Sequence, residues 1–413
     1  MNINLARRID FLAGVPICFI LSIINRIRRA LCLNKKPSKN PKKILFIELS
    51  EMGSTILAYS AMKKAKELFP QAELYFLIFE ENKASISLLG TIPQKNILVV
   101  RRKTFFGLIL DTLKLLGRFR EEKFDITIDL ELFSRFTNIL SYLSGAPQRS
   151  GFYKFEWEGL YKGTFQTHKV AYNCHLHISI NFLALVYALK TKNNAQPLLK
   201  KYLGKEPPYE LPHIDFGQER KEKIMKKLQE ISPSINISKK IIVLNPDAGK
   251  FLPIRAWPLE KYSQLTKKLL SDKNNYVVIM GVKPARKQAA EICQTVNNPR
   301  CIDLVGKTKL SEIIDLFNVS CMLITNDSGP AHFAALTPIK IVVFFGPETP
   351  KLYAPLSHNK RIIYSNFACS PCLCAFNHRK TSCKDNQCLK TISVDYVYDV
   401  VKKFLSNETA SVM

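Results

Sequence analysis

The chain has 413 residues, with 61 Lys and Arg against 34 Asp and Glu, and a formal net charge of +27. This length is enough for two domains, each with its own core, and the charge favours anionic partners. The basic residues are dispersed, and no helix-turn-helix, RNA-recognition or zinc-finger signature accompanies them. Acidic lipid and phosphorylated substrates are therefore the expected partners, and nucleic acid is not.

Residues 1–32 combine apolar and basic side chains. The run from Phe11 to Ile24 is 14 residues long and almost wholly apolar. Arginines flank it on both sides: Arg7, Arg8, Arg26, Arg28 and Arg29. As a helix the run would span roughly 21 Å, short of the ~30 Å hydrocarbon core, so one crossing is not expected. We predict a monotopic or peripheral segment on anionic lipid. A signal peptide and a buried core helix are the alternatives.

After a polar linker at 33–42, residues 43–195 show the alternation of a first α/β domain. Apolar runs predict strands at 43–50, 73–79, 96–100 and 124–130. Helical stretches separate them at 53–69, 81–90, 105–121 and 131–144. Repeats of this length indicate a parallel sheet with helices on both faces. The segment 147–174 is expected to be irregular, and a helix is predicted from His175 to Leu189.

Residues 196–215 are rich in Lys and Pro and form the expected interdomain connection. The second domain, 216–405, repeats the alternation. Its expected strands are 240–245, 275–280, 321–325 and 339–345, and its expected helices are 258–271, 284–297, 310–319 and 329–336. The predicted fold is therefore two doubly wound, Rossmann-like domains that face each other across a cleft.

The stretch from Thr325 to His332 (TNDSGPAH) follows an apolar strand and precedes a helical run. Small residues at such a junction let backbone N–H groups approach a ligand, and a helix N-terminus favours an anion. A diphosphate would suit this turn. The alternative is an ordinary turn in which Asp327 or Ser328 only caps the helix.

The first strand of each half also runs into a turn that contains Gly. In the first half the turn carries Gly53 and Ser54, and in the second it ends at Lys250, with Arg255 five residues later. Because ligands bind beyond the carboxyl ends of parallel strands, both cations are placed to reach a ligand. Their alternative role is as solvated surface charges.

These segments together resemble glycosyltransferase family 9, the heptosyltransferase-like enzymes of bacterial lipopolysaccharide assembly. Five stretches carry the resemblance: ILFIELSEMGSTILAYSAMKKAK, NPDAGKFLPIRAWPLEKY, TNDSGPAHFAAL, IVVFFGPETPKLYAP and a Cys-containing C-terminal stretch. They cover about residues 43–405 in order and spacing, and the TNDSGPAH and FFGPETP pair is the most specific.

The resemblance implies a GT-B fold and an inverting transfer of a sugar, typically heptose from ADP-heptose, with no cofactor needed for catalysis. The implied acceptor is a lipopolysaccharide core or another glycolipid at the cytoplasmic side of the bacterial inner membrane. By resemblance Arg255 contacts the donor phosphates, and further residues line the donor pocket. These are Lys250, Gly281, Lys283, Asp327, Ser328, Gly329, Pro330, His332, Gly346, Pro347 and Thr349.

One position departs from the family pattern. Members usually carry Asp directly after the Gly of the first turn, where it looks like the catalytic base, and this chain has Ser54. We predict that Glu51 acts as the base, with Glu48 the lesser candidate. Alternatively, either Glu is exposed or pairs with a nearby Lys. An inactive GT-B scaffold, a nucleotide-sugar binding protein and an epimerase that needs no acceptor are the rival functions.

Residues 369–388 contain five of the 11 cysteines. A C-x₂-C pair followed by two more cysteines predicts a structural zinc site at Cys369, Cys372, Cys383 and Cys388, with His378 a spare ligand. The second pair is spaced more widely than in the best zinc signatures. Unmetallated thiols in a reducing cytoplasm are the alternative.

Overall fold

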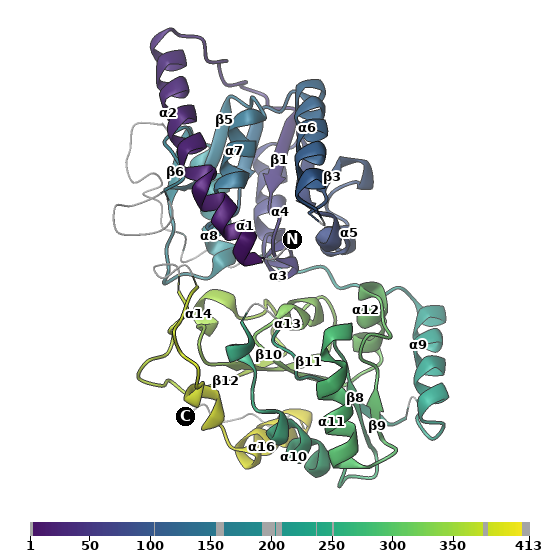
Figure 1. Ribbon diagram of the computed structural model, residues 1–413. Helices are drawn as coiled ribbons and strands as arrows, with labels where there is room; N and C mark the ends of the chain where they lie inside the picture. Colours follow the sequence, from purple (N-terminus) through teal and green to yellow (C-terminus); the bar gives the residue numbers. More distant parts are fainter. Residues whose placement is uncertain are drawn as a thin grey trace. The chain divides into compact units, whose positions relative to one another are not determined.

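The computed structural model describes residues 3–102, 104–153, 161–191, 203, 209–236, 238–249, 252–374 and 379–406. The chain divides into two compact units, each an α/β layer structure (Figure 1). The division falls between Glu210 and Leu211, and Arg379 belongs to the first unit. Each unit is described by itself below.

The first unit contains a six-stranded parallel sheet in the order β3-β2-β1-β4-β5-β6. Its strands are β1 (Lys43–Ile47), β2 (Glu73–Phe79), β3 (Ile97–Val100), β4 (Ile126–Asp129), β5 (Gln148–Tyr153) and β6 (His168–Ala171). Its helices after β1 are α3 (Met52–Leu57), α4 (Tyr59–Leu68), α5 (Lys83–Leu89), α6 (Phe105–Glu122), α7 (Arg135–Leu143) and α8 (Ile178–Ala188). The predicted alternation is confirmed in this unit.

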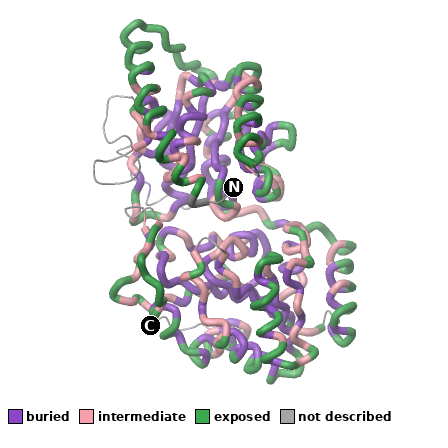
Figure 2. Tube along the Cα trace, in the orientation of Figure 1, coloured by how far each residue is buried: buried purple, intermediate pink, exposed green. Residues whose placement is uncertain are grey.

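Helices cover both faces of this sheet, so its central strands are apolar on both sides. On one face Leu115 and Phe119 of α6 and Leu140 of α7 pack in one cluster with Leu45 and other strand residues. Helices α4 and α8 pack against each other elsewhere in the unit. The central strands are buried along their length in Figure 2.

The N-terminal segment is more helical than the sequence predicted. Helix α1 (Ile3–Leu12) and helix α2 (Gly14–Ala30) join through backbone hydrogen bonds on both sides of Ala13. The helical stretch Leu5–Ala30 is 26 residues long, enough by length and composition to cross a membrane. Signal sequences and core helices meet the same criterion. The length argument used only the 14-residue run Phe11–Ile24, whereas the helix is longer, so length alone does not exclude a crossing.

The prediction of an irregular segment at 147–174 was also wrong. It contains β5 and β6, which add two parallel strands to the sheet edge. The sequence of β5, QRSGFY, has no apolar run, and its buried Arg149 is tolerated because backbone carbonyls accept its hydrogen bonds. Its guanidinium donates to the carbonyls of Ala146 and Phe165 at 2.6 and 2.7 Å.

The second unit repeats the architecture, with strand order β12-β11-β10-β7-β8-β9. Its strands are β7 (Lys240–Asn245), β8 (Asn275–Ile279), β9 (Cys301–Asp303), β10 (Met322–Asn326), β11 (Lys340–Phe345) and β12 (Lys360–Tyr364). Its α-helices are α9 (Gln218–Ile231), α10 (Leu259–Leu269), α11 (Arg286–Val296), α12 (Leu310–Asn318), α13 (Gly329–Ala334), α14 (Pro350–Tyr353), α15 (Gln387–Lys390) and α16 (Val394–Leu405).

Sequence analysis missed several elements in this unit, most of them short or polar, and it also missed the 12-residue amphipathic helix α16. Strand β9 has three residues, and α9 buries little more than Ile224, Met225 and Leu228 on an otherwise charged helix. The core itself is aromatic at its centre. Trp257 stacks on Phe344 with ring centroids 4.8 Å apart, and both rings meet Tyr262 edge-on.

Candidate active site

Four loops that sequence analysis selected in the second unit lie at one edge of its sheet. They follow β8, β7, β10 and β11, which are neighbours in the sheet. Because all four strands are parallel, their carboxyl ends and the loops that follow lie together. The tertiary structure therefore assembles residues that are about 100 positions apart.

Two buried asparagines tie these loops together. Asn245 donates to Thr325 Oγ1 at 3.0 Å and to Ser328 Oγ at 3.2 Å, which joins the loop after β7 to the loop after β10. Asn326 donates to the carbonyl of Pro246 at 2.8 Å and accepts from the backbone N–H of Trp257 at 2.9 Å. These bonds hold the two turns in one arrangement, because each amide is buried and a broken bond would be costly.

Arg255 lies against the same turns. Its Nη1 is 3.2 Å from Asp327 Oδ2, and its Nη2 donates to the carbonyl of Ala248 at 3.4 Å. The side chain is 14% exposed. Within the described residues its buried Nε has no hydrogen-bond partner. A guanidinium held in this way retains donors for an anionic ligand.

No side chain among the described residues caps the N-terminus of α13 with a hydrogen bond. Ser328 occupies the N-cap position, but it makes no capping hydrogen bond, and its hydroxyl instead donates to the carbonyl of Asn326 at 3.1 Å. The alternative that Ser328 only caps the helix is therefore not supported. Pro330 has no N–H, so Ser328 and Gly329 are the available amide donors of the turn. His332 is buried within α13.

The other predicted donor residues lie in the loops after β8 and β11. Gly281 and Lys283 follow β8, and the carbonyl of Gly281 accepts from the N–H of Gly306 at 2.9 Å. Gly346 faces inward, since a Cβ there would meet Cys388 Sγ at 2.9 Å. Thr349 caps α14 by accepting from the N–H of Lys351. Lys250 lies outside the described residues.

Comparison with known proteins decides the family. A model of glycosyltransferase family 9 (heptosyltransferase) matches residues 112–381, which is more than half of the chain. The chain belongs to glycosyltransferase family 9. It is therefore a glycosyltransferase with two parallel-sheet domains, as the sequence predicted.

Relatives in this family cover most of the chain. Lipopolysaccharide heptosyltransferase 2 of Escherichia coli is 25% identical over 325 residues, 78% of this chain and 87% of that protein. Lipooligosaccharide heptosyltransferase 2 of Campylobacter jejuni is 24% identical over 379 residues, 88% and 98% of the two chains. The solved structure of Escherichia coli ADP-heptose lps heptosyltransferase II matches with a TM-score of 0.66 at 22% identity, over 89% of this chain and all of that one.

In the first unit, the turn after β1 contains Ser54, which stands where members of family 9 usually carry Asp. Glu51 precedes α3, and Gly53 and Ser54 lie in its first turn. Ser54 Oγ donates to Glu51 Oε2 at 3.4 Å, a long hydrogen bond. Glu51 also pairs with Arg379 of the same unit at 2.6 Å, and its side chain is 51% exposed. A carboxylate therefore lies beside position 54, although residue 54 itself has none.

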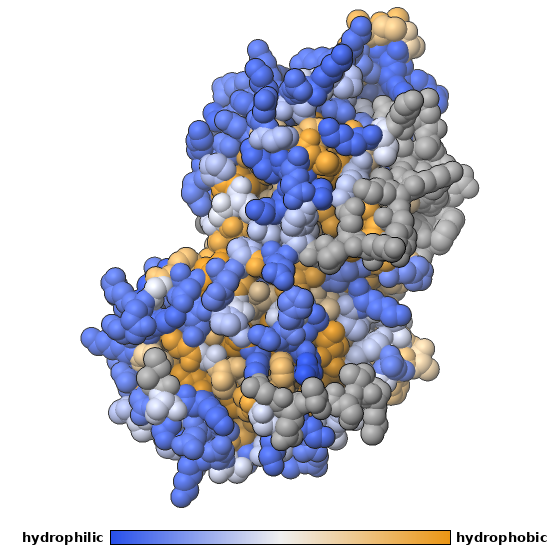
Figure 3. All heavy atoms as spheres, turned by 180° about the vertical axis from the view of Figure 1, so that it is seen from behind, coloured by the Kyte–Doolittle hydropathy of each residue, from blue (hydrophilic) through white to orange (hydrophobic). Residues whose placement is uncertain are grey.

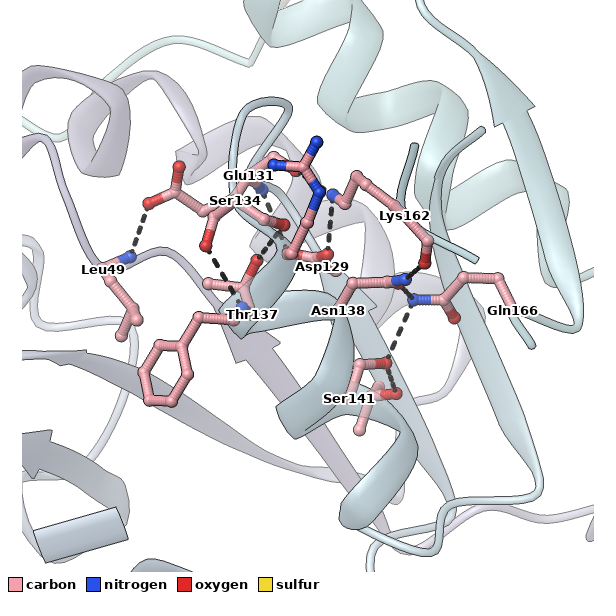
Figure 4. Close-up of polar contacts among 12 residues, drawn as sticks. Leu49, Asp129, Glu131, Ser134, Thr137, Asn138, Ser141, Lys162 and Gln166 are labelled. Carbon is pink, nitrogen blue, oxygen red and sulfur yellow. Dashed lines mark hydrogen bonds and ion pairs between the residues drawn. The ribbon is translucent and has the colours of Figure 1, made fainter. Parts of the chain in front are cut away.

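A buried polar cluster follows the neighbouring strand β4 (Figure 4). Lys162 Nζ lies 3.1 Å from Asp129 Oδ2 and donates to the carbonyl of Glu131 at 2.5 Å. Glu131 Oε1 accepts from the backbone N–H groups of Leu49 and Ser50 at 3.1 and 2.9 Å. Burial raises the pKa of both carboxyls, and Lys162 opposes that rise at Asp129. The cluster thus fixes the turn after β1.

Glu48 is the second candidate base, but its surroundings do not suit that role. The side chain is 3% exposed, and burial, followed by the nearby carboxyl of Glu131, raises its pKa well above the usual range. Burial favours the protonated form of this carboxyl, and a protonated carboxyl cannot accept a proton. Between the two candidates, the geometry favours the exposed Glu51.

Sequence analysis missed Asp129, Glu131 and Lys162. Asp129 is the last residue of β4, and Glu131 follows two residues later. The carboxyl-end rule that selected Glu51 would have found both if it had been applied to this strand. Lys162 carried no signal, because it lies in a loop rich in Gly and aromatic residues. It also missed Asn245 and Asn326, which only long-range hydrogen bonds reveal.

The predicted zinc ligands lie close enough to influence one another. Burial raises the pKa of Cys388 to about 11, with further contributions from Cys372, Cys369 and Cys383. Within the described part of the chain, no group of three His, Cys, Asp or Glu side chains is placed to hold a metal ion. His378 lies outside the described residues. As placed, the thiols of Cys369, Cys372, Cys383 and Cys388 do not form a metal site.

Proposed function

We propose that this enzyme transfers heptose from ADP-heptose to a lipopolysaccharide-core acceptor at the cytoplasmic face of the bacterial inner membrane. The observation that carries the proposal is the position of Arg255 between Asp327 and the carbonyl of Ala248, beside the turn of Ser328 and Gly329. The names of the relatives supply heptose, ADP-heptose and lipopolysaccharide as the substrate class.

The proposed chemistry uses these groups in one displacement with inversion. The acceptor oxygen attacks the anomeric carbon while the bond to the diphosphate breaks, so negative charge develops on the departing ADP. The guanidinium of Arg255 and the amides of Ser328 and Gly329 stabilise that charge without a metal. Glu51 takes the proton of the acceptor hydroxyl, a role worth roughly 10²–10⁴-fold in rate.

The test is transfer by the full-length protein from ADP-heptose to a heptose-deficient lipopolysaccharide core, followed as ADP release and as product by mass spectrometry. ADP-glucose and a uridine diphosphate sugar serve as competing donors. We expect Arg255→Ala to lower kcat by about 10²–10³-fold. Lys268→Ala is the matched control, since Lys268 pairs with the exposed Asp395 on the surface of the same unit.

Other outcomes would identify the rival functions. A scaffold binds ADP but leaves ADP-heptose unconsumed when acceptor is supplied. An epimerase converts a nucleotide sugar in the absence of any acceptor. Equal turnover by wild type and Arg255→Ala would contradict the assigned role of this arginine.

A further inference from the structure

Helices α1 and α2 are fixed to the first unit along a narrow seam. The seam residues recur at helical spacing: Asp10, Gly14, Cys18, Ser22 and Asn25. Gly14 allows close approach, since a Cβ there would meet the Cβ of Arg135 at 2.9 Å. Ser22 Oγ accepts from the N–H of Thr164 at 2.9 Å, and Cys18 is fully buried. The helix is therefore part of this domain.

The opposite side of the same helix is apolar and exposed. Its exposed fractions reach 70% at Leu12, 57% at Phe19 and 45% at Ile23. We call this side the outer face; it comprises Leu12, Phe19, Ile20, Ile23, Ile24 and Ile27. A contiguous apolar side of this kind on a soluble surface indicates a partner.

A second exposed apolar patch lies on the first half of α6. Phe106 is 77% exposed, Leu110 58% and Leu113 59%, and these residues recur along one side of the helix. We call this the α6 patch, and it also includes Phe105 and Ile109. The one acidic residue in this half of α6, Asp111, is buried and pairs with Arg101 at 2.7 Å.

Both patches lie on the same side of the unit. Helices α6 and α7 share one cluster on one sheet face, and α1 and α2 pack on α7 (Figure 1). Helices that follow parallel strands start at the carboxyl edge of the sheet, so Phe106 lies near that edge. Asp10 lies there too, because it contacts the first residues of α7. On the view from behind, hydrophilic side chains cover most of the visible described surface of this unit (Figure 3).

We propose that the outer face and the α6 patch form one surface that docks on an anionic phospholipid bilayer, with the helix lying in the plane of the interface. Charge selects this occupant. Exposed arginines flank the outer face at both ends, Lys114 is exposed beside the α6 patch, and Asp10 and Asp111 are turned inward and paired. A crossing helix would have to leave the domain, which would break the Asp10–Arg135 ion pair and place the polar seam residues Ser22 and Asn25 in hydrocarbon.

The consequence concerns the acceptor. Glu51 follows β1 at the carboxyl edge of the same sheet, so docking through this surface brings the proposed base near the membrane. A lipid-anchored acceptor would then reach the enzyme without leaving the bilayer. This consequence rests on the proposed function, whereas docking itself does not.

Binding of the full-length protein to vesicles of phosphatidylglycerol and phosphatidylethanolamine tests the proposal, with phosphatidylcholine vesicles for comparison. We expect the double substitution Phe106→Ser with Leu110→Ser to lower the partition coefficient at least about tenfold. Tyr396→Ser on α16, where Tyr396 is 54% exposed, should leave it unchanged. Unchanged binding by the α6 variant, or a variant that alters self-association and not vesicle binding, would overturn it.

The depth at which the N-terminal helix inserts distinguishes a helix in the plane of the interface from one that crosses the bilayer. Phe19 is near the middle of Leu5–Ala30, so a crossing helix would place Phe19→Trp at the bilayer centre. We expect strong quenching by lipids brominated near the headgroup and weak quenching by lipids brominated at the chain end. The reverse order would overturn the in-plane arrangement. Transfer to a deacylated, water-soluble acceptor should survive the α6 substitutions, so loss of docking and loss of chemistry remain distinguishable.

Discussion

The carboxylate of Asp10 caps the N-terminus of α7, which begins at Arg135. It accepts hydrogen bonds from the backbone N–H groups of Arg135 and Phe136 at 3.0 Å each, and it lies 3.1 Å from Arg135 Nη1. Ser134 accepts from the N–H of Thr137. A residue more than 100 positions away therefore supplies the cap that this helix start needs.

Asp10→Ala should release the N-terminal helix from the domain. The substitution removes two capping bonds and leaves the Arg135 side chain, 5% exposed, without its ion-pair partner. We expect a loss of about 2–3 kcal/mol, between the cost of a lost cap and that of an unpaired buried charge. Asp10→Asn keeps an oxygen acceptor and should lose less.

Two measurements check this expectation. Urea unfolding reports the stability, and alkylation located by mass spectrometry reports exposure of Cys18, which is fully buried in the wild type. Lys223→Ala breaks the exposed pair with Glu219 and serves as a control without effect. If Cys18 stays protected in Asp10→Ala, the seam does not depend on this cap.

Glu51→Gln should abolish most turnover while leaving ADP binding intact. The amide cannot accept the acceptor proton, so we expect kcat to fall by about 10²–10⁴-fold. Ser54→Asp in the Glu51→Gln background returns a carboxylate to the position where family members usually carry one, and it should restore part of the rate. Initial rates with saturating ADP-heptose measure both variants. Full turnover by Glu51→Gln would show that another group is the base.

Glu48 should make stability depend on pH. Because its pKa is raised in the folded state, the folded protein holds a proton that the unfolded chain releases. Stability from this group is complete below the unfolded pKa of about 4.3 and is lost as pH rises toward the folded pKa. Glu48→Gln removes the titration, so its stability relative to wild type should increase with pH. The gain is about 1.4 kcal/mol for each pKa unit of the shift.

Urea unfolding of wild type and Glu48→Gln at pH 5 and at higher pH, up to about pH 8, measures this difference. Ionisable groups that do not interact with Glu48 cancel in this comparison, whereas the neighbouring Glu131 contributes to the difference. A difference that does not change with pH would mean that Glu48 is ionised in the folded protein or titrates normally.

Metal analysis decides the predicted zinc site. That prediction expects about one equivalent of zinc in freshly purified protein and its loss in Cys372→Ser, with Cys32→Ser as the control. Binding would require the thiols of Cys369, Cys372, Cys383 and Cys388 to close on the ion, and metal would lower the raised pKa of Cys388. Less than about a tenth of an equivalent would leave these cysteines as unmetallated thiols.

The alternation of the central strands with helices was readable from sequence alone. Apolar runs of strand length marked β1, β2, β7 and β10, because a strand buried on both faces must be apolar along its length. The turns of Gly53 and Gly329 were readable for a related reason, since they follow such runs directly. Both patterns are local, because each apolar run lies within a few residues of the turn that follows it.

Tertiary structure alone decided which distant residues support those turns. Lys162 meets Asp129, Asn245 meets Thr325, and Asp10 meets Arg135, each across a long stretch of chain. Strands β5 and β6 likewise form at the sheet edge without an apolar run of their own. The hydrophobic pattern of one segment shows which of its faces is buried. A hydrogen bond between two distant segments forms only where the tertiary fold brings the donor and the acceptor together.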